Sequence, residues 1–166
     1  MSNFFSLLGE NIKSYPQIKI SKTAELFVQN AVLTRLGMSN LNALRDRYEG
    51  QSFLDKHQSR LFANLALREH HGEVIRRTSF KLIDDEENCF SINGKSYDII
   101  VCQFGELPVI KSPKAFNNPN ILVYQRDIFW MYIIGIIDLD VLQDDRSYIK
   151  RSNLYQFQSF DKIKRL

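Results

Sequence analysis

The chain has 166 residues, which suffices for one domain of common size with a substantial buried core. Hydrophobic residues make up 44% of it and charged residues 25%, a balance that excludes a wholly disordered chain. A net charge of +3 is too small to indicate nucleic-acid binding unless the basic residues are clustered.

The first predicted helix follows a short extended stretch at 18–20. Apolar residues recur every three or four positions over 24–36, which is the period of a helix buried on one side. Ser21 or Thr23 is expected to open this helix, and Gly37 to end it in a left-handed conformation.

Two further helices are predicted before residue 73. Ser39 opens a short one, which Gly50 is expected to stop. The next begins at Ser52, with Asp55 three positions on in the arrangement of a capping box, and ends near 70–72. All these helices are apolar on one side only, so they are expected to pack on the strands that follow.

The second part of the chain is predicted to be rich in strands. Its apolar residues alternate or form short runs, and Asn93-Gly94 is a strong signal for a tight hairpin turn. The strand at 97–103 is expected to pair with 107–111 as a hairpin. In chain order, strands are expected at 74–82, 89–92, 97–103, 107–111, 121–124, 128–137 and 154–157.

One apolar region fits two structures. We favour the two strands 121–124 and 128–137, because β-branched and aromatic residues dominate them. A helix over 120–132 is the alternative, since apolar residues there also share one helical face. If these strands form, Gln125-Arg126-Asp127 is expected to be the turn between them. An alternative, functional interpretation is that Arg126 faces a cleft and binds a phosphate.

The cysteines and the apolar runs indicate a cytoplasmic protein without a membrane segment. Cys89 and Cys102 lie in separate apolar runs without metal-type spacing, so free thiols are expected. The first ten residues show no signal peptide. The longest apolar run, 128–137, is shorter than the roughly 20 residues that a membrane helix needs.

Basic side chains cluster near the end of the chain, while acids gather at 84–87 and 138–145. Six basic residues and one acid, Asp161, lie between residues 146 and 166. Such a segment can neutralise phosphates or can be an ordinary solvated surface. The residues predicted to contact nucleic acid are Arg126, Lys150, Arg151, Lys162, Lys164 and Arg165.

The stretch 94–111 carries the candidate catalytic chemistry. Asp98 stands at the start of one strand and Lys111 at the end of its expected hairpin partner, so the two side chains can meet. Asp98 can bind a hard cation such as Mg²⁺ through its carboxylate. Lys111 can orient an attacking water or stabilise charge on a phosphoryl oxygen.

This arrangement resembles the restriction endonuclease-like, or PD-(D/E)XK, nuclease superfamily, in which an acid on one strand precedes an acid-x-lysine on the next. Asp98 matches the first acid and Lys111 the lysine, and Glu73 or Glu69 matches the family's helical glutamate. The resemblance covers residues 69–137. It implies a restriction endonuclease-like core, a Mg²⁺ cofactor and a DNA substrate.

The sequence departs from the family at two positions. Val109 stands where the second acid is expected, and Tyr97 precedes Asp98 in place of proline. Glu106 is the nearest spare carboxylate and is assigned as a second metal ligand, with Glu73 as the supporting catalytic acid. Three interpretations stay open: the acid has moved to Glu106 or Glu73, the protein is an inactive relative that still binds nucleic acid, or the match is accidental.

Two other groups have a structural and a functional interpretation. His70-His71 with Glu69 fits the dipole of a helix end, but a histidine there can also bind metal or act as a general base. Trp130 is expected in the core and not as a platform for stacked bases.

The sequence therefore predicts one α+β domain, in which N-terminal helices (1–72) pack on a mixed, largely antiparallel sheet (73–166). The leading hypothesis is a Mg²⁺-dependent nuclease acting on DNA phosphodiesters, active or catalytically impaired, and a homodimer to cut both strands. The alternative is a non-enzymatic protein- or nucleic-acid-binding module with no metal site.

Overall fold

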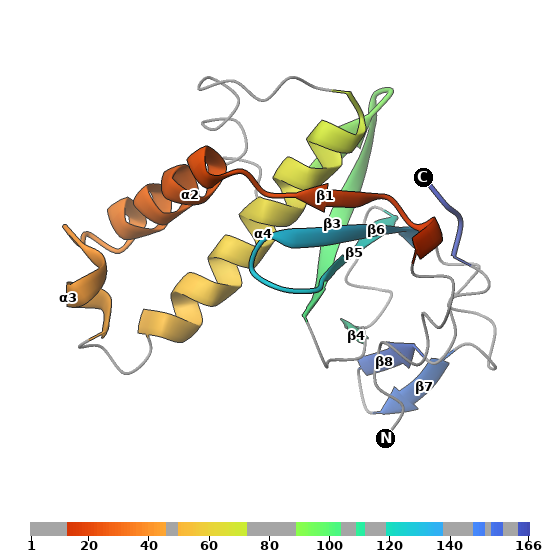
Figure 1. Cartoon of the computed structure of the whole chain (residues 1–166). Coiled ribbons are helices and arrows are strands. Elements are labelled where there is room, and N and C mark those ends of the chain that lie inside the picture. The colour runs from red at the N-terminus through yellow and green to blue at the C-terminus, as the bar shows by residue number, and fades with distance from the viewer. Residues whose placement is uncertain are drawn as a thin grey trace.

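The computed structural model describes residues 13–45, 50–72, 89–103, 109–111, 119–137, 148–151, 154–157 and 163–166 (Figure 1). The helices are α2 (Lys22–Arg35), α3 (Leu41–Arg45) and α4 (Gly50–His70). The strands are β1 (Gln17–Lys19), β2 (Cys89–Ile92), β3 (Lys95–Gln103), β4 (Val109–Lys111), β5 (Asn120–Gln125), β6 (Trp130–Ile137), β7 (Tyr148–Arg151) and β8 (Leu154–Phe157).

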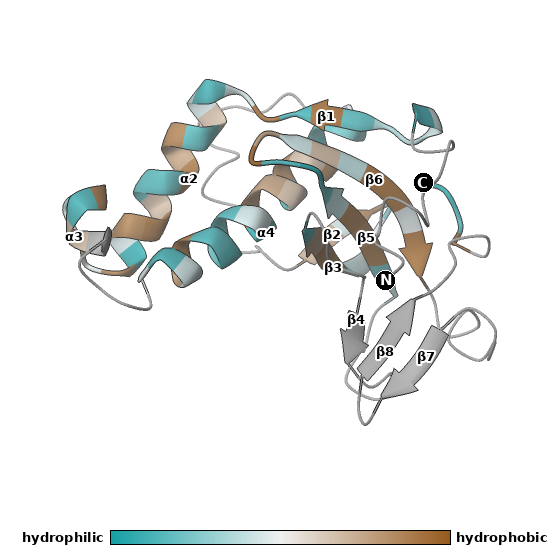
Figure 2. Ribbon diagram, turned by 60° about the horizontal axis from the view of Figure 1, so that its bottom comes forward, coloured by the Kyte–Doolittle hydropathy of each residue, from teal (hydrophilic) through white to brown (hydrophobic). Residues whose placement is uncertain are grey.

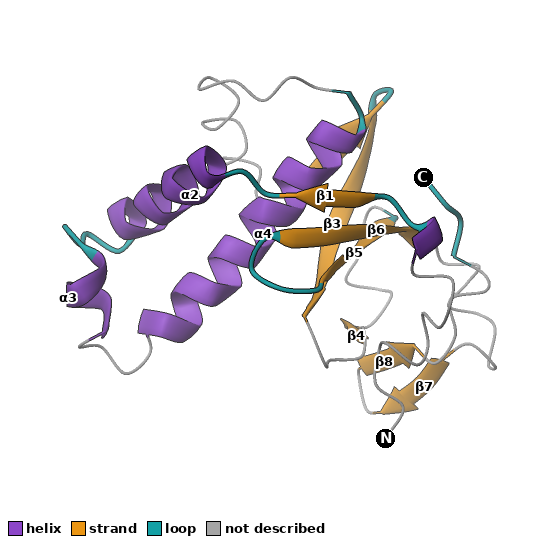
Figure 3. Cartoon of the chain, in the orientation of Figure 1, coloured by secondary structure: helices purple, strands orange, loops and turns teal. Residues whose placement is uncertain are grey.

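Five of the strands form a mixed sheet in the order β1-β6-β5-β3-β2, and β4, β8 and β7 form a second one. Within the larger sheet, only β3 and β5 run parallel, and the other neighbours are antiparallel. Figure 3 shows the helices on one side of this sheet. The predicted α+β class, with helices packed on a mixed and largely antiparallel sheet, is confirmed.

Local capping signals fixed the first helix. The Oγ of Ser21 accepts a hydrogen bond from the backbone N–H of Ala24 at 3.1 Å, so Ser21 is the N-cap of α2. Gly37 follows the helix with φ at +64°, as its place after the last apolar residue predicted.

The predicted boundary between the next two helices was wrong. Asn40, and not Ser39, caps α3, because its Oδ1 accepts from the N–H of Ala43 at 2.9 Å. Gly50 begins α4 instead of ending the helix before it. Asp55 therefore lies in the second turn of α4, where its Oδ1 accepts from Gln51 Nε2 at 2.8 Å. The end of α4 near residues 70–72 is confirmed.

The tight turn between β2 and β3 is confirmed. Asn93 and Gly94 both have positive φ, +50° and +77°, as a two-residue hairpin turn of type I′ requires. Cys89 pairs with Asp98 across this hairpin.

The predicted hairpin between 97–103 and 107–111 was wrong. β3 pairs with β2 and β5, whereas β4 pairs with β8 in the other sheet, where Lys111 lies opposite Leu154. In Figure 1, β4 lies beyond the Gln103 end of β3. Sequence adjacency suggested the hairpin, but the apolar stretch of β3 at 99–102 pairs in parallel with the buried strand β5 of the larger sheet.

The favoured two-strand interpretation of the next apolar region is confirmed, and the helical alternative is wrong. β5 and β6 form an antiparallel hairpin, and Arg126 N–H donates to the carbonyl of Trp130 at 3.0 Å across the turn between them. Asp127 Oδ1 accepts from the N–H groups of Phe129 and Trp130, so Gln125-Arg126-Asp127 does lead into a turn.

The core lies between α4 and the larger sheet. Leu61, Phe62 and Leu65 of α4 pack over Ile121 and Val123 of β5, all almost fully buried. Val28 and Val32 of α2 join the same cluster. Figure 2 shows the apolar colouring of β5 and of the later part of β6. Because successive side chains of a strand alternate, Tyr97, Ile99 and Val101 face α4 and Asp98 faces the other way.

Several predicted segments fall outside the described residues: the strand at 74–82 and the acidic groups at 84–87 and 138–145. Cys89 and Cys102, the two cysteines of the chain, are not joined by a disulfide, as predicted. Among the described helices, none combines the length and apolar character that crossing a bilayer requires.

The C-terminal residues close onto β6 at a glycine. Ile136 N–H donates to Lys164 O at 2.7 Å, beside Gly135, whose φ is +149°. A Cβ at position 135 would overlap the backbone carbonyl of Lys164 and would lie 2.8 Å from Ile163 Cγ2. The absence of a side chain at Gly135 therefore permits this contact.

We expect Gly135→Ala to lower the free energy of unfolding by roughly 3–5 kcal/mol, from backbone strain plus overlap with the C-terminal segment. Gly37→Ala is the matched control, because its φ is also positive but no atom lies within 4 Å of the added Cβ. It should cost about 1–2 kcal/mol. Urea denaturation measures both, and equal losses would contradict the proposed steric role of Gly135.

Candidate functional site

Two of the four residues that the sequence grouped into one catalytic site lie in the described part of the chain, and they are on different sheets. Asp98 lies on β3 of the larger sheet and the backbone of Lys111 on β4 of the smaller one. β4 lies near the Gln103 end of β3, five residues from Asp98, a span of about 17 Å along a strand. Glu73 and Glu106 lie outside the described residues. The assignment of these four residues to one site stays a prediction, without the hairpin that suggested it.

Asp98 has a different polar neighbour, Asn120. The two residues are in register on the parallel strands β3 and β5, and both lie on the face away from α4. Asn120 is only 3% exposed, and its Oδ1 has no hydrogen-bond partner within the described part of the chain. Further along this face, burial raises the pKa of Tyr124 to about 12, helped by nearby Cys102 and Tyr132. Asp98 and Asn120 thus place two side-chain oxygens at neighbouring positions on this face of the sheet.

The histidines at the end of α4 form no metal site with their described neighbours. His70 is half-buried and His71 is exposed, and the ring of His71 packs edge-on against Phe90 at 6.1 Å. Across the described residues, no three His, Cys, Asp or Glu side chains come together in a way that could hold a metal ion.

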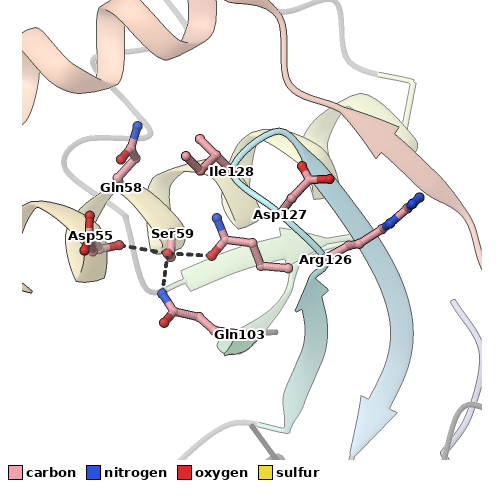
Figure 4. Close-up of a pocket in the computed structure, with 8 residues that line it drawn as sticks. Asp55, Gln58, Ser59, Gln103, Arg126, Asp127 and Ile128 are labelled. Carbon is pink, nitrogen blue, oxygen red and sulfur yellow. Dashed lines mark hydrogen bonds between the residues drawn. The ribbon is translucent and has the colours of Figure 1, made fainter. Parts of the chain in front are cut away.

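A polar pocket of about 330 Å³ opens at the carboxyl ends of β3 and β5, beside α4. This edge of parallel strands is a common position for ligands in open sheets. The pocket is lined by Asp55, Gln58, Ser59, Gln103, Gln125, Arg126, Asp127 and Ile128 (Figure 4).

Ser59 is the centre of this pocket. Its Oγ accepts from Gln103 Nε2 at 2.8 Å and lies 2.6 Å from Gln125 Oε1 and 2.8 Å from the carbonyl of Asp55. A hydroxyl has one proton, so it can donate to only one of the two oxygens at a time. Rotating the Gln125 amide by half a turn would place Nε2 toward Ser59 and satisfy all three contacts.

The network ties two strands to one helix. Gln103 and Gln125 are the last residues of β3 and β5 and are in register, so their amides stand side by side facing α4. Ser59 is 5% exposed and Gln125 8%, which makes this a polar group inside the packed layer. Such a group is tolerated only when its hydrogen bonds are made.

A second group of interest runs along the face of the sheet away from α4. Lys19 Nζ lies 5.8 Å from the centre of the Trp130 ring, and Arg126 Nη1 lies 3.4 Å from the hydroxyl of Tyr132. Beyond the start of β1, Arg165 stacks 4.7 Å from the ring centre of Tyr15. We call this set, Tyr15, Lys19, Arg126, Trp130 and Arg165, the outer strip.

Arg126 is thus directed differently from the rest of its turn. Figure 4 shows its side chain pointing away from Ser59 and Gln103, while Ile128 and Asp127 stand over the pocket. The predicted core position of Trp130 is only partly correct, because the ring is half-buried and lies beneath a lysine. The sequence offered one signal for the pocket, a glutamine at the end of each of two apolar strands.

We expect Ser59→Ala to cost about 1–3 kcal/mol of unfolding free energy, because it leaves the buried Gln125 amide without its partner. Ser52→Ala, on an exposed site of the same helix, removes the same hydroxyl and should change stability by less than about 0.5 kcal/mol. Chemical denaturation of the two variants checks this, and equal effects would show that the Ser59 network contributes little.

Comparison with known proteins adds no assignment. The chain matches no protein-family model, no curated protein and no solved structure.

Proposed function

We propose that this protein is a non-enzymatic nucleic-acid-binding module that contacts the phosphate backbone through the outer strip. The observation that supports this most is that each cation of the outer strip lies beside an aromatic ring. Single-stranded nucleic acid is held by the same combination, with cations on phosphates and aromatic rings under bases.

The cations of the outer strip are available to a ligand. Lys19, Arg126 and Arg165 are exposed, and none makes an ion pair within the part of the chain that the structure describes.

The aromatic rings hold the cations in place. Trp130 and Tyr15 are half-buried, and each has a cation over its ring. A cation over a ring is stabilised by about 0.5–1 kcal/mol at exposed sites. This positions the charged ends with less loss of side-chain entropy on binding.

Part of the basic segment that the sequence predicted to contact nucleic acid lies at or next to the outer strip. Lys164 and Arg165 are exposed, and Arg165 also donates to the Oγ of Ser14 at 2.8 Å, next to Tyr15. For Lys150 and Arg151 only the backbone of β7 is described, and Lys162 lies outside the described residues. Arg126, which the functional interpretation of the 125–127 turn predicted to bind a phosphate, also belongs to the outer strip.

We expect Lys19→Gln and Arg165→Gln each to weaken binding of single-stranded DNA uniformly across sequences. Each should also reduce the slope of log affinity against log salt by roughly 0.7–0.9, as loss of one phosphate contact does. Fluorescence anisotropy with a labelled oligonucleotide at several salt concentrations measures both quantities.

The matched control is Lys95→Gln. Lys95 is also exposed at a strand and lies 5.6 Å from the ring centre of Tyr97, but on the opposite side of the sheet order from β1. Its loss should leave the salt slope unchanged. If the native protein binds no DNA or RNA at low salt, or if Lys95→Gln weakens binding as much as Lys19→Gln, the proposal is wrong.

The pair Asp98–Asn120 supports a second candidate, the Mg²⁺-dependent cleavage of DNA that the sequence predicted. One carboxylate and one buried amide oxygen without a partner among the described residues fit part of the shell of Mg²⁺, which keeps several of its waters. A bound metal of this kind supplies an activated water and stabilises charge on a phosphoryl oxygen. Asp98 and Asn120 would orient it from β3 and β5.

This candidate predicts that Mn²⁺ or Mg²⁺ raises the melting temperature of the native protein but not that of Asp98→Asn, because the substitution removes the carboxylate charge that holds the cation. Asp55→Asn, an exposed acid elsewhere, is the control. Plasmid cleavage by the native protein, lost in Asp98→Asn and Lys111→Ala, would extend the result to catalysis. A metal shift that survives in Asp98→Asn would falsify the assignment.

A further inference from the structure

The polar pocket contains hydrogen-bonding groups that the network around Ser59 does not use. Gln103 uses Nε2 toward Ser59, and its Oε1 has no hydrogen bond with any described residue. Gln58 directly precedes Ser59 on α4 and lines the same pocket. Its amide likewise makes no hydrogen bond with a described residue. Acceptors and donors therefore stand together at the mouth of a preformed hollow, which is typical of ligand sites.

The charge of the pocket excludes a phosphate. Asp55 and Asp127 both line it, whereas the guanidinium of Arg126, the lining residue with a positive charge, points away toward the outer strip (Figure 4). An anionic group placed here would meet two carboxylates. A neutral ligand with amino groups would instead find acceptors in these carboxylates and in Gln103 Oε1.

One wall of the pocket is apolar and unusually exposed. Ile128, at the tip of the β5–β6 turn, is 56% exposed and stands over the opening. With a volume of about 330 Å³ the pocket is near the lower limit for small-molecule sites. A single flat ring against Ile128, with its polar edge on the amides, fits both the size and the distribution of polarity.

The β5–β6 turn joins this pocket to the outer strip. Arg126 extends to one side of the sheet, onto Tyr132, while its neighbours Asp127 and Ile128 border the pocket on the other. A strand whose phosphates contact Arg126 would therefore have a base within reach of Ile128. The phosphates would lie on the cationic side of the turn, at Arg126, and the base on the side of the pocket.

We propose that the pocket binds an unpaired nucleobase carrying an exocyclic amino group, from a single strand whose backbone lies on the outer strip. This proposal rests on the proposed function. It adds the class of ligand that the pocket binds and explains how the protein would prefer some bases over others. Amide side chains recognise such edges by paired hydrogen bonds, since an amide offers an acceptor beside a donor.

Anisotropy titrations with oligo(dA), oligo(dC) and oligo(dT) test the preference. We expect the native protein to bind oligo(dA) and oligo(dC) more tightly than oligo(dT), which has no amino group. Gln103→Leu should weaken the first two by about 5- to 100-fold and leave oligo(dT) unchanged. Gln29→Leu, on α2, is the matched control and should change none of them.

Ile128→Ser provides a variant without a folding cost, because the side chain is exposed. It should weaken all three oligonucleotides by removing the stacking surface, whereas Leu26→Ser, 50% exposed on α2, should not. Binding without base preference, lost in Lys19→Gln but intact in Gln103→Leu and Ile128→Ser, would overturn the pocket and retain the outer strip. Adenosine binding in the pocket with no oligonucleotide binding would overturn both.

Discussion

The parallel ladder between β3 and β5 decides which side chains of this protein become neighbours. Six residue pairs are in register along it, from Asp98 beside Asn120 to Gln103 beside Gln125. A parallel pair must be buried on both faces, and α4 covers one of them with Leu61, Phe62 and Leu65. Alternation along the two strands then sends Gln103 and Gln125 toward the helix and Asp98 and Asn120 away from it. The Asp98–Asn120 pair and the polar pocket around Ser59 both follow from this single pairing.

The glutamine pair shows how the fold tolerates polarity next to its core. Gln103 and Gln125 terminate their strands where α4 still covers the sheet, so their amides cannot be fully hydrated. Ser59 supplies a partner for both, and the backbone carbonyl of Asp55 lies in the same network. Neutral groups suit this place, because a charge there would lose hydration that a hydroxyl cannot replace. The cost of desolvation is thereby kept small while hydrogen-bonding capacity remains at the surface.

Charge is distributed unevenly around the β5–β6 turn. Asp127 uses Oδ1 to cap the turn through Phe129 and Trp130, which places its carboxylate on the pocket side. Arg126, one residue earlier, bonds to Tyr132 on the opposite face. Because consecutive side chains leave a turn in different directions, two adjacent residues create a cationic surface and an acidic rim. A polyanion with neutral, amino-bearing bases is complementary to both.

The sequence by itself determined the local structure. Ser21 and Gly37 fixed the ends of α2, Asn93-Gly94 fixed the β2–β3 turn, and β-branched composition separated β5 from β6. These depend on backbone dihedrals and short hydrogen bonds, which involve residues only a few positions apart. Tertiary structure decided the pairing of strands, because β4 left β3 for β8 through contacts between distant segments. That choice separated Asp98 from Lys111, and it brought Ser59 from α4 to two glutamines 44 and 66 residues away. No local pattern encodes such distances, since they arise only when the apolar faces of a helix and a sheet are buried together.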